Sequence, residues 1–116
     1  MDKTKNKATG NTGEELATEY LKSSKYTILG RNISYPFGEI DILAENNGTI
    51  VIVEVKTVLG SGWGSARDLV RHKKQEKLRL LALQIMNEYP RQDVRIDVIA
   101  INQGKIEHIV SAIEGK

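Results

Sequence analysis

The spacing of apolar residues along the chain predicts two helices and five strands. Apolar positions at three-and-four spacing predict a helix over residues 14–25 and a longer one over residues 66–88, which Pro90 ends. Short apolar runs predict strands over residues 26–31, 94–101 and 106–110, and two more strands lie within residues 38–56. The order is helix, three strands, helix, two strands. It predicts a single α/β domain with a mixed β-sheet flanked by helices.

Residues 38–56 have the pattern of a β-hairpin. Asn47-Gly48 separates two apolar segments, and both residues tolerate the positive φ that a tight turn requires. If these are the two turn residues, Asn46 pairs with Thr49. The same register sets Asp41 opposite Glu54.

The second strand of this hairpin carries an anomalous charge. Residues 50–55 are apolar except for Glu54, as expected for a strand covered on both faces. Lys56 lies on the same face as Glu54, about 6.6 Å along the strand. Facing carboxylates are destabilising, and burying an ion costs several kcal/mol, so something must compensate for Asp41 and Glu54.

A divalent cation would provide that compensation. Mg²⁺ takes oxygen ligands, commonly one or two carboxylates, and it activates a bound water for attack on phosphate. Lys56 would then orient this water or stabilise the anionic transition state. The alternative interpretation is that Glu54 and Lys56 form a solvated ion pair at the end of a strand.

The N-terminal half of the long helix is basic. Stepping back along its apolar face from Leu78 leads to Lys74, Arg71 and Val70, so the inward face changes from apolar to basic. Together with Lys73 and Lys77, these residues predict a surface for nucleic-acid phosphates.

One further residue, Trp63, has two interpretations, and for two others, His108 and Asp97, a structural role is favoured. Trp63, in the glycine-rich loop at residues 60–65, would stack on an exposed base or plug the edge of the domain. His108 has no second histidine or cysteine at ligand spacing, which favours a core or surface histidine over a metal ligand. Asp97 is expected to be structural.

Composition narrows the class of protein. The chain of 116 residues is enough for one domain, and it has no cysteine and therefore no thiolate chemistry. We expect a cytoplasmic protein without membrane contact, because no apolar run approaches the length of a span or a signal peptide. The net charge is only +2. Residues 1–12 are polar, basic and without periodicity, which predicts a disordered tail before a domain at residues 13–116.

Several short motifs together carry a family resemblance. They are Gly13-Glu14-Glu15-Leu16-Ala17, Arg31-Asn32, Gly38-Glu39-Ile40-Asp41, Val53-Glu54-Val55-Lys56, Val70 with Lys74, Arg95-x-Asp97-Val98 and His108-Ile109. An acid followed after a dozen residues by Glu-x-Lys resembles the active-site motif of the restriction-endonuclease-like superfamily. The whole set resembles the YraN-like family of predicted endonucleases, which is similar to archaeal Holliday junction resolvases.

The resemblance implies roles for individual residues. It implies a restriction-endonuclease-like fold, with Asp41, Glu54 and Val55 at the metal, Glu14 as the helical acid near it, and Glu39 as an outer acid. It places a recurrent lysine at Lys74 and a phosphate contact at Arg31. Position 34 is serine where the family usually has a second arginine, so one phosphate contact is absent.

These observations predict a nuclease that uses Mg²⁺, or Mn²⁺ as a substitute, to hydrolyse DNA phosphodiesters. Asp41, Glu54, Lys56 and Glu14 are the expected catalytic residues. The resemblance suggests branched DNA, and a symmetric dimer would suit paired cuts in a four-way junction. The alternatives are a non-catalytic nucleic-acid-binding module of the same fold and a nuclease for RNA or single strands.

Overall fold

The computed structural model describes residues 2–58 and 72–112, with side chains described for residues 13–57 and 76–112. The elements, in order, are α1 (Asp2–Ser23), β1 (Thr27–Tyr35), β2 (Gly38–Asn46), β3 (Thr49–Val58), α2 (His72–Glu88), β4 (Val94–Asn102) and β5 (Lys105–Ile109). This confirms the predicted order of helices and strands.

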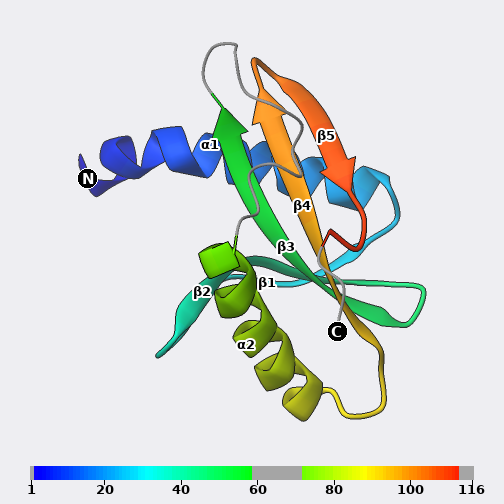
Figure 1. Cartoon of the computed structure of the whole chain (residues 1–116). Helices are drawn as coiled ribbons and strands as arrows, with labels where there is room; N and C mark the ends of the chain where they lie inside the picture. The colour runs from blue at the N-terminus through cyan, green and yellow to red at the C-terminus, as the bar shows by residue number, and fades with distance from the viewer. Residues whose placement is uncertain (1, 59–71, 113–116) are drawn as a thin grey trace.

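The strands form one mixed sheet in the order β1-β2-β3-β4-β5 (Figure 1). The β3–β4 pair is parallel and the other three pairs are antiparallel. Helix α2 lies in the crossover between the two parallel strands, as a connection between parallel neighbours requires. The chain is therefore the single α/β domain that the sequence predicts.

The two helices cover opposite faces of the sheet (Figure 1). On one face, Ala17 and Leu21 of α1 pack against Ile42, Val53 and Ile99 in one cluster of buried side chains. On the other, α2 contributes Leu78, Leu81, Ala82 and Ile85 to a second cluster, which includes Ile50, Ile52, Ile96 and Val98. Strand β3 supplies alternate residues to both clusters, so it is covered on both faces, as its continuous apolar run predicts.

Helix α1 begins earlier than the apolar pattern predicts. It starts at Asp2, so helical backbone runs through the segment expected to be a disordered tail. Residues 2–12 have no apolar stripe, which is why periodicity indicates a helix only from about residue 14. The division into a tail and a domain at Gly13 stays a prediction. In α2, the predicted residues 66–71 lie outside the described residues.

Gly13 allows α1 to approach the end of β3. It is buried, and a Cβ atom there would collide with the hydroxyl of Thr57. We expect Gly13→Ala to lower the free energy of unfolding by about 1–2 kcal/mol despite alanine's better helix propensity. Urea unfolding would measure this, and Thr57→Ala in the same chain should restore most of the loss. Equal losses with and without Thr57→Ala would contradict the proposed collision.

The β1–β2 ribbon changes face near its middle. Arg31 pairs with Ile42 and Ile33 pairs with Ile40. Ile42 packs under α1 whereas Ile40 and Ile33 pack under α2, although residues two apart on a regular strand point to the same side. Asn32, between the two pairs, has a φ of 52°. Asp41 therefore lies where the ribbon turns over.

No helix within the described parts of the chain has the length and apolar character needed to cross a membrane.

Candidate active site

The register of the β2–β3 hairpin is the one predicted from its turn. Asn47 and Gly48 have φ values of 51° and 85°, and Asn46 pairs with Thr49. Pairing continues to Ile42–Val53 and ends there. Asp41 thus occupies the point at which β2 leaves β3.

The Asp41 carboxylate takes over the hydrogen bond that β2 no longer makes. Its Oδ2 accepts the backbone N–H of Val55 at 2.8 Å. An unpaired backbone donor inside a sheet is costly, so this bond fixes the carboxylate against the segment that carries Glu54 and Lys56. The local break in the ladder is what brings Asp41 to the Glu-x-Lys motif.

The charges of three other acids act on Asp41. Burial, above all, and then the charge of Glu54 raise the pKa of Asp41 to about 6 against the opposing hydrogen bond from Val55, and Glu14 and Glu39 add to the rise. We call these four side chains, Asp41, Glu54, Glu14 and Glu39, the acid cluster. A carboxyl group with this pKa is poorly compensated within the protein, a property that concentrates at functional sites.

Glu54 and Lys56 form an ion pair in which the acid is largely buried. Lys56 Nζ lies 3.8 Å from Glu54 Oε2, and the side chains are 34% and 12% exposed. The alternative of a solvated pair at a strand end therefore describes Lys56 better than Glu54. The partly exposed ammonium group thus lies beside the largely buried Glu54 carboxylate.

Glu14 reaches the acid cluster from α1. Its Oε1 lies 3.7 Å from Arg31 Nη2, and this buried oxygen accepts no hydrogen bond. Glu15, one residue on, is 60% exposed and accepts a hydrogen bond from Arg31 Nη1 at 3.1 Å. Arg31, expected to bind phosphate, is thus paired with two acids of α1.

The other predicted site residues differ in how far they are described. Glu39 is exposed, and the exposed Lys77 lies with its aliphatic stem against Gly38. Lys73 and Lys74 belong to the first turn of α2, but their side chains are not described. Arg71 and Trp63 lie outside the described residues. Their predicted roles stay predictions.

The donors of the acid cluster suit a hard cation. All are oxygens, and the buried Glu14 Oε1 lacks a hydrogen-bond donor, as an oxygen awaiting a cation would. In the described part of the chain, no group of three or more histidine, aspartate or glutamate side chains lies close enough to hold a metal ion. Mg²⁺ needs only one or two carboxylates, because waters and substrate oxygens complete its shell. The residues present therefore fit such an ion.

A second polar cluster, which the sequence analysis did not predict, lies under α1 on β4 and β5. Asp97 is fully buried, and it accepts hydrogen bonds from Arg95 Nε at 3.0 Å, His108 Nε2 at 2.8 Å and the N–H of Ser111 at 2.9 Å. Tyr20 OH bonds to His108 Nδ1 at 2.9 Å. Burial raises the pKa of Asp97, but the bonds from His108, Arg95 and Ser111 outweigh it and lower the pKa.

This second cluster has the features of a structural network. Each polar group in this cluster has a hydrogen-bond partner. The network joins α1, β4 and β5 through side chains distant in sequence. The structural role expected for Asp97 agrees with these contacts, and of the core and surface positions expected for His108 the structure shows one close to the core. The signal available in the sequence was an acid interrupting an apolar run, with Arg95 two residues before it on the same face.

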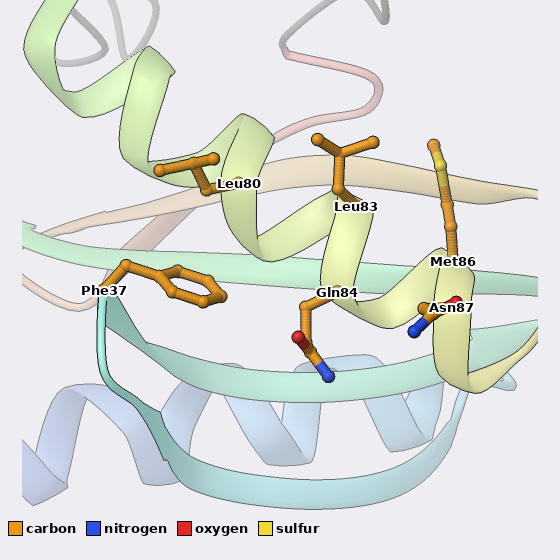
Figure 2. A pocket seen from close by; sticks show the side chains of 6 residues that line it. All are labelled: Phe37, Leu80, Leu83, Gln84, Met86 and Asn87. Carbon is orange, nitrogen blue, oxygen red and sulfur yellow. The ribbon is translucent and has the colours of Figure 1, made fainter.

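An apolar hollow lies on the outer side of α2 (Figure 2). Its lining consists of Phe37, from the turn between β1 and β2, and Leu80, Leu83, Gln84, Met86 and Asn87 of α2. None of these side chains titrates or carries charge. The hollow therefore offers no acid–base chemistry, and it shares no residue with the acid cluster.

A family model described as "Uncharacterised protein family UPF0102" matches residues 13–101. A UPF0102 protein of Thermodesulfovibrio yellowstonii is 49% identical over 107 residues, covering 89% of this chain and 93% of the relative. A UPF0102 protein of Persephonella marina is 43% identical over 107 residues, covering 90% and 92%. These matches are consistent with the YraN-like resemblance of the motifs.

Proposed function

For this chain, which belongs to the UPF0102 family, we propose a function on the basis of the site. The proposed function is that of a metal-dependent nuclease that hydrolyses DNA phosphodiesters. The observation that carries the proposal is the Asp41 carboxylate, bonded to Val55 N–H between Glu54 and Lys56 and raised in pKa to about 6 by burial and neighbouring acids. A single uncompensated acid could be incidental. Carboxylates that can hold a divalent ion beside a lysine can supply two things used in phosphodiester hydrolysis, a metal-activated water and a positive charge for the developing anion.

Asp41 and Glu54 would hold the ion, and Glu14 would join them only once the ion is bound, with Glu39 at the outside and the backbone of Val55 beside them. A bound Mg²⁺ or Mn²⁺ would lower the pKa of a coordinated water and stabilise charge on the phosphate oxygens. Lys56 would orient the attacking water or stabilise the developing negative charge from its half-exposed position. The basic residues Lys73, Lys74 and Lys77 of α2, and Arg71 before it, would bind the DNA backbone.

Branched DNA, such as a four-way junction, is the substrate class that the resemblance to the YraN-like family suggests. A two-fold symmetric junction would suit a symmetric dimer, with one cut from each subunit. A non-catalytic binding module of the same fold would use the basic residues alone, and its affinity would be indifferent to Asp41.

Cleavage of a labelled four-way junction tests the proposal. We expect cutting with Mg²⁺ or Mn²⁺, none with EDTA, and loss of cutting in Asp41→Asn and in Lys56→Ala. Matched duplex, single-stranded DNA and RNA in the same assay would identify the preferred substrate. Junction binding that is unchanged by EDTA and by Asp41→Asn, without cleavage of any substrate, would instead support the binding module.

A further inference from the structure

Arg31 of β1 forms ion pairs with two acids of helix α1, one of which, Glu14, belongs to the acid cluster. Arg31 lies opposite Ile42, the residue that follows Asp41, and its side chain is 27% exposed. Its guanidinium contacts Glu14 at 3.7 Å and Glu15 at 3.1 Å. An acid of the cluster and an exposed acid outside it therefore share one cation.

The two contacts differ in kind. Glu15 accepts a hydrogen bond from Nη1, whereas the Glu14 contact is longer than a hydrogen bond, and Glu14 Oε1 is buried without a donor. Arg31 Nε is also buried without an acceptor. Glu15 thus holds the guanidinium near Glu14 without satisfying Glu14. The charge of Glu14 is therefore balanced by an ion pair but not by a hydrogen bond to Oε1.

From this geometry we infer that Arg31 is a placeholder cation: it balances Glu14 in the metal-free protein and gives Glu14 up when a divalent ion binds. The inference rests on the proposed function, since it assumes a cation site at Glu14. Two positive charges next to one carboxylate repel each other, so Arg31 and the ion compete for Glu14. Arg31 is accordingly a positioning residue in the metal-free state.

The released guanidinium has a second use. Its forked donors match phosphate oxygens, and the orphaned Nε adds a donor that has no partner in the metal-free protein. Metal binding would therefore free a phosphate-binding group beside the acid cluster. Through this one side chain, the affinity for DNA becomes coupled to the presence of the metal.

Calorimetric titration of the protein with Mg²⁺, without DNA, tests the competition. We expect Arg31→Gln to bind Mg²⁺ about tenfold more tightly than wild type, because a nearby positive charge is removed. Arg31→Lys keeps that charge and should stay near wild type. Arg91→Gln removes an exposed charge shortly before Val94, where β4 begins, and its Mg²⁺ affinity should also match that of wild type. Equal or weaker binding by Arg31→Gln would overturn the placeholder role.

Affinity for a four-way junction with Ca²⁺, which occupies such sites without supporting cleavage, or with EDTA tests the coupling. Wild type should gain more affinity from Ca²⁺ than Arg31→Gln gains, and equal gains would overturn the coupling. The proposed function and the placeholder role are contradicted by different results. If wild type binds no cation, or if Asp41→Asn binds as tightly, the proposed function fails. If binding depends on Asp41 but not on Arg31, only the placeholder role fails.

Discussion

Replacing Asp97 with alanine is expected to lower the free energy of unfolding by about 3–5 kcal/mol, a large fraction of the stability of a domain of this size. The variant would leave the Arg95 guanidinium, the His108 ring and the Ser111 N–H without their shared acceptor. Removing one member of a buried charged network leaves the others uncompensated, which costs more than the net value of the pair. Urea unfolding at pH 7 would measure the loss.

The same network gives the protein a predicted sensitivity to acid. Because the folded-state pKa of Asp97 is lowered, its ionised form contributes stability above its unfolded pKa of about 3.9, and this contribution is lost as the pH falls through the folded value. The control is Asp97→Asn, which keeps the shape but not the charge. We expect its free energy of unfolding to fall less than that of wild type below about pH 4. A loss under about 1 kcal/mol for Asp97→Ala would contradict the network's role.

The features predicted most accurately from the sequence are those set by local chemistry. Asn47-Gly48 fixed the hairpin register, because few residue pairs tolerate two positive φ values and the register follows from the turn. The apolar stripe of α2 identified its buried face for a similar reason. Neither prediction required knowledge of contacts with distant parts of the sheet.

The part that the sequence did not reveal depends on contacts between distant elements. Glu54 and Asp97 give the same signal, an acid in an apolar strand, yet one belongs to the acid cluster and the other to a satisfied network. The two acids differ in the neighbours that the fold places beside them. His108, on the strand next to Asp97, hydrogen-bonds to it, whereas the neighbour of Glu54 is a second acid, Asp41. The turn of the ribbon at Asn32 and Asp41 was also invisible, since the strand pattern continues through it.

Asp41→Asn is expected to raise the free energy of unfolding, whereas Asp97→Ala lowers it. Burial and the neighbouring acids raise the pKa of Asp41 to about 6 from 3.8, so its ionised form destabilises the folded state at neutral pH. Asparagine removes the charge and keeps an oxygen for the Val55 N–H. After allowance for partial exposure, we expect a gain of about 1–2 kcal/mol in the free energy of unfolding at pH 7.5.

The pH dependence of this gain follows from the sign of the shift. A raised folded-state pKa means that wild type gains stability as the pH falls from above 6 towards 4, because the folded protein takes up the proton first. The advantage of Asp41→Asn should therefore be full above pH 7 and vanish near pH 4. Unfolding by urea at both pH values measures it, with Asp97→Asn as a control that loses stability at pH 7.5. A variant less stable than wild type at pH 7.5 would mean that the Val55 hydrogen bond needs the charge.

A divalent cation should reverse which of the two proteins, wild type or Asp41→Asn, is more stable. An ion that binds only the folded state raises its stability by mass action, by about 2.7 kcal/mol at a hundredfold excess over its dissociation constant. Wild type with Mg²⁺ should therefore reach or exceed the stability of Asp41→Asn, which should gain little. Thermal unfolding with Mg²⁺ or EDTA would measure both shifts. A larger gain for wild type would mean that the empty acid cluster destabilises the folded protein and that the ion compensates its charges. Equal gains in the two proteins would place the ion elsewhere.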